Sequence, residues 1–259
     1  MGADLRALLL VATVAVAAAC GGQGGSAPAD GVVPPTPPTT ATTAGPAPES
    51  STSAPAADGL DAGTALVARP TGPVAVAPAP GAAPTLELPA TTEFGSPRAL
   101  LVVDRQDGWL QVALPERPNG STGWIVDDGS VELREVDERI EIDLAARTLT
   151  LYDGGTEVLT TPVAIGSADA PTPTGDFYVV DKLATGDPDH AYGPFAFGLS
   201  AHSDVLTEFA GGDGQVGIHG TNDPASVGQA VSHGCIRVPN DVAVALDARL
   251  ALGTPVRIG

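Results

Sequence analysis

The chain has 259 residues, with 31 Asp and Glu against 12 Lys and Arg, so its formal net charge at pH 7 is −19. An acidic chain repels phosphate backbones, which excludes nucleic acid as an expected partner. The length leaves room for one or two domains with their own cores once low-complexity segments are set aside.

The N-terminus has the form of an export signal. Residues 7–19 (ALLLVATVAVAAA) are a thirteen-residue apolar run, too short to span a bilayer. The run ends in small residues before Cys20 and resembles a bacterial lipobox, in which the cysteine is lipidated after cleavage. We therefore expect residues 1–19 to be a signal peptide, and Cys20 to carry a lipid at the outer face of the cytoplasmic membrane. Ordinary cleavage, or an unmodified cysteine, is the alternative.

A linker is expected to follow. Residues 20–63 consist mainly of Pro, Ala, Thr, Ser and Gly and offer almost nothing to bury, which predicts a disordered tether. Such a tether would hold a folded unit about 36 Å from the membrane as a flexible coil, within reach of the cell wall.

Residues 64–135 are predicted to form a small β domain. The stretches ALLVVDRQ, DGWLQVAL and NGSTGWIV mix β-forming residues with Gly or Asn breaks, and Leu110, Val112 and Leu114 give the second stretch one apolar face. The segment resembles a bacterial SH3-type barrel. Its two tryptophans, Trp109 and Trp124, are expected to pack in the core rather than bind a ligand.

Residues 137–259 are also predicted to be mainly β, with a β-sandwich-like arrangement. RIEID points Ile140 and Ile142 to one side and TLTLY does the same with Leu149 and Leu151, which predicts a hairpin. VLTTPVAIG and GDFYVVDKL add strands. A helix capped by Asn240 or Asp241 is expected through VAVALDARLAL, stopped by Gly253, before a closing strand VRI.

Cys235, in SHGCIRVPN, has no expected disulfide partner if Cys20 is lipidated. A Ser-x-x-Lys acyl-enzyme is excluded, because Lys182 is the only lysine and Val179 stands three residues before it. A hydrolase elbow at Ser232 lacks the surrounding βαβ pattern. A metal site could draw on Cys235 and the histidines, but the spacings do not match the usual zinc sites; those histidines are His190, His202, His219 and His233. A purely structural cysteine would leave the flanking Ser-His-Gly unexplained.

The remaining interpretation is a thiol nucleophile with a histidine base. A thiol with an ordinary pKa of about 8.5 is mostly protonated at neutral pH and needs a base. His219, sixteen residues earlier at the end of an apolar stretch, is the expected base. Gly234 allows close approach of the backbone to a substrate, and the amides of Gly234 and Cys235 are candidate oxyanion donors.

The segment IHGTNDPASVGQAVSHGCIRVPN resembles the signature of the L,D-transpeptidases with a YkuD-type catalytic domain. RTLTLYDGG, PVAIGSADAPTPTGDFYV and YGPFAFGLS are similar to that family's opening strands, Pro-Thr-Gly turn and lid. The resemblance covers residues 139–259.

The resemblance implies a role for each matching residue. Cys235 would be the nucleophile and His219 its base, the carbonyl of Gly220 would orient His219, and His233 would shape the oxyanion pocket with Gly234 and Cys235. Among the substrate-binding candidates, Ser232 is expected to hold the loop by hydrogen bonds, and Arg237 to meet a substrate carboxylate or to brace the site. Tyr192 and Phe197, in the lid-like stretch, are expected either to touch substrate or to pack.

The implied reaction is acyl transfer on peptidoglycan without a metal or organic cofactor. The thiol would attack the third residue of a tetrapeptide stem and release D-alanine, and the amine of a neighbouring diamino acid would resolve the thioester into a 3→3 cross-link. Carbapenems are the implied inhibitors. Alternatives are an L,D-carboxypeptidase, protein anchoring to the wall by the same chemistry, or a catalytically silent wall-binding lipoprotein.

Overall fold

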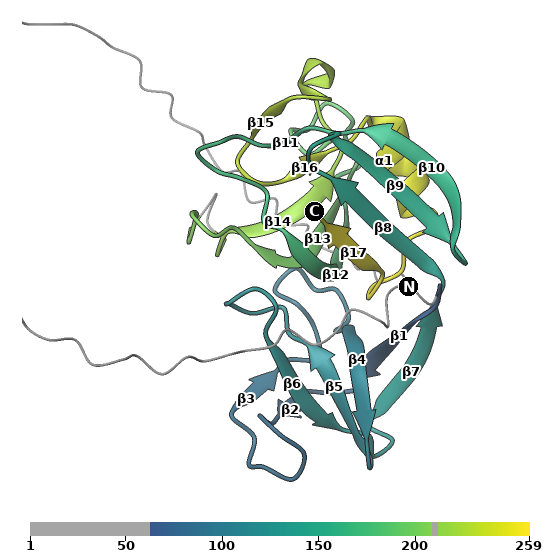
Figure 1. The fold of residues 1–259 in the computed structure, drawn as a ribbon, viewed down its shortest axis with the longest axis vertical. Helices are drawn as coiled ribbons and strands as arrows, with labels where there is room; N and C mark the ends of the chain where they lie inside the picture. The colour runs from purple at the N-terminus through teal and green to yellow at the C-terminus, as the bar shows by residue number, and fades with distance from the viewer. Residues whose placement is uncertain (1–62, 209–211) are drawn as a thin grey trace, which may run out of the picture. The chain divides into compact units, whose positions relative to one another are not determined.

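The computed structural model describes residues 63–208 and 212–259, which form a mainly β structure with a short α-helix near the C-terminus (Figure 1). The expected signal peptide, Cys20 and the tether up to residue 62 lie outside the described residues. Within the described ranges, no helix combines the length and the apolar character needed to cross a membrane.

The N-terminal part is built on a five-stranded antiparallel sheet in the order β6-β5-β4-β1-β7. The strands are β1 (Ala65–Pro70), β4 (Leu100–Gln106), β5 (Trp109–Ala113), β6 (Thr122–Val126) and β7 (Val131–Val136), with a side hairpin of β2 (Val74–Val76) and β3 (Leu86–Leu88). The predicted apolar face of β5 is confirmed, because Leu110 and Val112 are fully buried. The resemblance to an SH3-type barrel stays a prediction.

The expectation for the two tryptophans is wrong. Trp109 and Trp124 are each only partly buried, and neither belongs to the buried cluster of this part. In β5 the alternation that turns Leu110 inward turns Trp109 to the other face.

The C-terminal part is built on an eight-stranded sheet in the order β10-β9-β8-β17-β12-β13-β14-β16. Its strands are β8 (Glu138–Asp143), β9 (Thr148–Asp153), β10 (Thr156–Pro162), β12 (Gly175–Ala184), β13 (Phe195–His202), β14 (Gln215–His219), β16 (Ile236–Arg237) and β17 (Pro255–Ile258). A short parallel pair, β11 (Ile165–Gly166) and β15 (Ala230–Ser232), and a 3₁₀ turn η1 (Pro224–Ser226) complete it. The mainly β fold class is confirmed.

The predicted hairpin is confirmed by β8 and β9. They pair antiparallel with Ile140 opposite Leu151 and Ile142 opposite Leu149, and all four side chains are buried. The closing strand is also present as β17, which runs parallel to β8.

The predicted helix is shorter than expected. Helix α1 covers Asn240–Asp247, follows Pro239 at its N-cap, and ends six residues before Gly253. Asn240 therefore does not cap it, and Asp241 lies in its first turn instead. The side chain of Asn240 is used elsewhere, as described below.

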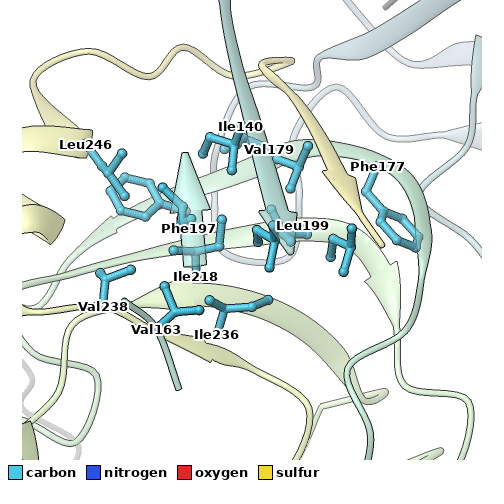
Figure 2. Packing of buried hydrophobic residues seen from close by; sticks show 14 of the residues in the cluster. Ile140, Val163, Phe177, Val179, Phe197, Leu199, Ile218, Ile236, Val238 and Leu246 are labelled. Carbon is cyan, nitrogen blue, oxygen red and sulfur yellow. The ribbon is translucent and has the colours of Figure 1, made fainter. Parts of the chain in front are cut away.

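Strand β12 contributes to two cores. Phe177 and Val179 pack into the core of the eight-stranded sheet, where Figure 2 shows them with Leu199. The alternate residues Tyr178 and Val180 belong to the buried cluster of the N-terminal sheet, and the Tyr178 hydroxyl donates to the carbonyl of Ala113 at 3.1 Å. The two sheets therefore share one strand's side chains.

A second connection joins the β5–β6 loop to the segment between β13 and β14. The Arg117 guanidinium donates to the carbonyls of Ser203, Leu206 and Asp213 at 2.7–3.0 Å. Asn119 exchanges two hydrogen bonds with the backbone of His202. These contacts fasten the N-terminal sheet to the end of β13 and to described residues between β13 and β14.

Candidate active site

Strands β14 and β16 are parallel neighbours in the eight-stranded sheet (Figure 1), and His219 and Cys235 lie in or next to them. In β14 and β16, Ile218 lies opposite Ile236 and His219 lies opposite Arg237. Cys235 comes directly before β16, and the Gly217 backbone makes a hydrogen bond to its thiol.

The same two strands decide which way the site faces. Ile218 and Ile236 are fully buried in the core cluster, and Figure 2 shows them side by side. Because successive side chains of a strand point to opposite faces, the residues flanking these isoleucines face away from that core. His219 and Arg237 therefore lie on the reverse face of the sheet.

The His219 imidazole is held in one tautomer. Its Nδ1 lies 2.5 Å from the carbonyl oxygen of Gly220, and a carbonyl only accepts, so Nδ1 carries the hydrogen. Nε2 is left with a lone pair that can take a proton. This is the carbonyl that the family resemblance assigned to orient the ring.

Both reactive groups are neutral at rest. Burial lowers the pKa of His219 to about 4, and the charges of Arg237 and His190 act in the same direction, against the Gly220 hydrogen bond. Burial also raises the pKa of the Cys235 thiol, although the Gly217 hydrogen bond and Arg237 oppose it. Near neutral pH both side chains are therefore uncharged, one a thiol and the other a neutral imidazole.

Internal hydrogen bonds shape the loop before Cys235. The Ser232 hydroxyl donates to the carbonyl of Cys235 at 2.6 Å and accepts from the amide of Gly234 at 3.1 Å. Ser232 is buried, so it holds the loop and is not placed to bind substrate. The Gly234 amide, expected to be an oxyanion donor, is already engaged, which leaves the Cys235 amide as the better candidate. Gly234 itself has φ +115°, a conformation that favours glycine.

Sequence reasoning missed Thr172, a residue outside the loop before Cys235 that is hydrogen-bonded to it. Its hydroxyl donates to the carbonyl of Gly234 and accepts from the amide of Gly166, each at 2.9 Å, and the side chain is buried. The sequence predicts only a turn for the PTPTG stretch. Nothing in its spacing indicates a contact 62 residues away.

The two aromatic candidates, Tyr192 and Phe197, lie in different environments. Tyr192 packs its ring against that of His219 at a centroid distance of 4.7 Å and an interplanar angle of 81°. Burial and the nearby Cys235 raise the pKa of Tyr192. Phe197 is fully buried in the core on β13, so it packs and has no surface for substrate. Most of the stretch taken as a lid is thus a sheet strand, and only residues 192–194 lie outside it.

The other candidates lie around this pair. Arg237 is partly buried on β16 and its charge acts on both His219 and Cys235, whereas His233 is exposed. His202 lies at the far end of β13, where it is paired with Gln215 and hydrogen-bonded to Asp213. Among residues 63–208 and 212–259, no three His, Cys, Asp or Glu side chains are grouped to hold a metal ion.

The C-terminal part of the chain is similar to known proteins. Residues 137–258 match the family model of the L,D-transpeptidase catalytic domain. The Bacillus subtilis protein YkuD, provisionally named an L,D-transpeptidase, is 36% identical over 119 residues, which is 46% of this chain and 64% of that protein. The comparisons therefore support an L,D-transpeptidase catalytic domain in the C-terminal part, while the chain spans less than two thirds of this relative's length.

Two solved structures are also similar. The catalytic domain of the Enterococcus faecium L,D-transpeptidase is 27% identical, with a TM-score of 0.35 over 48% of this chain and 97% of that one. An L,D-transpeptidase solved in complex with imipenem is 18% identical, with a TM-score of 0.42 over 73% of this chain and 99% of that one.

Proposed function

We propose that the protein is a peptidoglycan L,D-transpeptidase that forms 3→3 cross-links through a Cys235 thioester. The observation that carries the proposal is the strand pairing that places Cys235 beside the strand ending in His219, with His219 Nδ1 fixed on the Gly220 carbonyl. A catalytic base must be oriented before it can take a proton. The bond from Nδ1 to the Gly220 carbonyl would give His219 that orientation.

In the first step His219 Nε2 accepts the thiol proton as the Cys235 sulfur attacks the carbonyl carbon of the third stem residue. The resulting oxyanion would be stabilised by the Cys235 amide. When the C–N bond to the terminal D-alanine breaks, the imidazolium returns its proton to the departing amine. The product is a thioester and free D-alanine.

In the second step the amine of a neighbouring diamino acid attacks the thioester carbon. His219 Nε2 takes a proton from that amine and passes it to the sulfur as the C–S bond breaks, which restores the thiol and the neutral imidazole. A new amide bond then joins the two stems. No group outside the protein and its two substrates is consumed in this sequence.

Two side chains are suited to contact the donor stem. Arg237 lies next to the reactive pair, where its guanidinium could hold a stem carboxylate by paired hydrogen bonds. Tyr192 is 38% exposed beside His219, so the same ring that packs on the imidazole retains surface for a substrate.

Export and lipidation belong to the same proposal. The acyl-transfer substrate lies outside the cell, and the leader and Cys20 supply a route to the outer face of the membrane. We expect Cys20→Ala to release the protein from the membrane fraction.

Product analysis tests the function. The full chain carrying Cys20→Ala, so that Cys235 is its sole cysteine, is incubated with a disaccharide-tetrapeptide and the products are weighed. Cross-linked dimers lacking one D-alanine support the transpeptidase. Tripeptides would instead indicate an L,D-carboxypeptidase, dependence on an added protein amine would indicate anchoring, and unchanged substrate would favour a silent wall-binding protein.

A further inference from the structure

A turn between β12 and β13 covers the catalytic histidine. It runs from Thr185 to Pro194 and carries Tyr192, whose ring packs edge-on against His219. The Thr185 hydroxyl donates to the carbonyl of Gly193 at 2.5 Å, and the Gly193 amide donates to the carbonyl of His190 at 2.8 Å. These bonds shape the turn, but they do not attach it to the strand that ends in His219.

Asn240, the last residue of the SHGCIRVPN stretch, makes that attachment. Its Oδ1 accepts the backbone amide of Thr221 at 2.7 Å, and its Nδ2 donates to the carbonyl of Pro188 at 3.0 Å. One side-chain amide thus bonds the chain just after His219 and the turn that covers it.

Two glycines show how closely these segments meet. A Cβ added to Gly193 or to Gly220 would lie 2.3 or 2.4 Å from Asn240 Oδ1, far inside van der Waals contact. Gly220 is the residue whose carbonyl accepts the His219 Nδ1 hydrogen. The Asn240 oxygen therefore sits against both backbones that determine the position of the imidazole.

We propose that Asn240 is a positioning residue, whose side-chain amide joins the Gly220–Thr221 backbone to the Tyr192 turn and so keeps the His219 imidazole oriented and covered. The inference rests on the proposed function only for its catalytic consequence. What the inference states directly is that Asn240 determines the tautomer of His219 and keeps water away from its ring.

Two consequences follow for the imidazole. If the Thr221 amide loses its acceptor, the Gly220 carbonyl next to it is no longer fixed, and Nδ1 loses its preference for carrying the hydrogen. If the Pro188 contact is lost, the Tyr192 turn keeps the bond from Asn222 but loses the one from Asn240, and we expect water to reach the ring. Since burial is the largest cause of the low pKa of His219, hydration raises that pKa toward 6.5.

The test uses the full chain with Cys20→Ala and ¹⁵N-labelled histidine, read by NMR as a function of pH. In the parent, His219 is expected in the Nδ1–H form, with a pKa of about 4. In Asn240→Ala the ¹⁵N shifts should move toward a mixture of the two neutral tautomers, and the pKa of His219 should rise by about one unit or more. Donor turnover (kcat/KM) at pH 7 should fall by about tenfold or more, since a misplaced base loses much of its effect.

Asn222→Ala is the matched control. Asn222 also donates its side-chain amide to this turn, at the carbonyl of Asp189, but it makes no bond to the Thr221 amide. It should leave the tautomer and the pKa of His219 unchanged. Should Asn240→Ala fail to fold, Asn240→Asp keeps the Oδ1 acceptor while removing the donor, and should preserve the Nδ1–H tautomer while freeing the turn.

An unchanged tautomer and pKa in folded Asn240→Ala would overturn the inference, as would an equal change in Asn222→Ala. The NMR readout does not depend on turnover. A parent protein that shows the predicted His219 signals but no reaction with tetrapeptide would therefore contradict the proposed function and leave the positioning role intact.

Discussion

The reactive pair combines a thiol whose pKa is raised with an imidazole whose pKa is lowered, both chiefly by burial. The pair therefore rests uncharged, so in the proposed reaction the proton would be transferred as the sulfur attacks instead of beforehand. Arg237 contributes to this state in opposite senses, because its positive charge disfavours imidazolium and favours thiolate. An uncharged pair avoids the cost of burying two ions at a site enclosed by the Tyr192 ring.

The lowered pKa of His219 predicts a dependence of stability on pH. In the unfolded chain the imidazole takes up a proton as pH falls through 6.5, whereas in the folded chain it does so only near pH 4. The unfolding free energy should therefore be fully retained above pH 6.5 and fall between pH 6.5 and 4, by about 3 kcal/mol for this group.

Urea denaturation of the parent and of His219→Gln across this pH range isolates that contribution. The decline should be shallower in His219→Gln, because carboxylates titrate equally in both proteins. If the unfolding free energy falls equally with pH in the parent and in His219→Gln, then His219 is not buried as an uncharged ring.

At the scale of elements, the loop that carries Cys235 depends on a segment distant in sequence. Thr172 is buried and bridges the amide of Gly166 and the carbonyl of Gly234. Gly166 has no room for a side chain, since a Cβ there would lie 2.3 Å from the carbonyl oxygen of Ala170. Gly166 is thus packed against the backbone of residues 170–172, while β11 pairs with the loop before Cys235 at Ser232. The Thr172 hydroxyl joins these two segments.

Thr172→Val keeps the shape of the side chain and removes the hydroxyl. It leaves a buried amide and carbonyl without their partner, so the unfolding free energy should drop by about 1–3 kcal/mol. Thr160→Val is the control, because Thr160 is exposed on β10 and its loss should stay within about 0.5 kcal/mol. Equal urea midpoints for the two variants would contradict the bridging role.

The features that the sequence predicted are those that depend on residues close together in the chain, such as strand alternation and short motifs. The alternation of Ile140 and Ile142 with charged residues identified a hairpin because only one face of each strand is buried. The Cys235 and His219 pair was found through a motif. The sequence left open whether Phe197 packs or touches substrate, because resemblance along the chain does not reveal that this stretch is a central strand; the structure shows that it packs. Asn240 or Asp241 was expected to cap the helix because both precede its apolar run. The bond from Asn240 to Pro188, 52 residues away, leaves no local pattern in the sequence.

At the scale of the whole molecule, the two sheets are joined through β12. Tyr178 and Val180 are buried in the N-terminal cluster while their neighbours Phe177 and Val179 are buried in the other. In the sequence these residues form an uninterrupted apolar run, which does not reveal that two different cores share it. A strand with both faces buried couples the stability of the parts it separates.

This sharing predicts one unfolding transition. Both tryptophans lie in the N-terminal sheet, so their fluorescence reports that part, and the exposure of the Cys235 thiol to a disulfide reagent reports the other. In urea the two signals should change at the same midpoint. Tyr178→Ala should lower both midpoints together, by about 3–5 kcal/mol in unfolding free energy. Two separate midpoints in the parent would show that the sheets fold independently.

The measurement that bears most directly on acyl transfer by Cys235 is the intact mass after exposure to a carbapenem. The sulfur would attack the strained lactam carbonyl, the C–N bond would break, and the ring nitrogen would take the proton while staying tethered, so that the thioester persists. The full chain with Cys20→Ala should gain one drug mass, and the same chain with Cys235→Ala should gain none. An adduct that survives Cys235→Ala would place the nucleophile elsewhere, and the lack of any adduct on the parent would contradict the account.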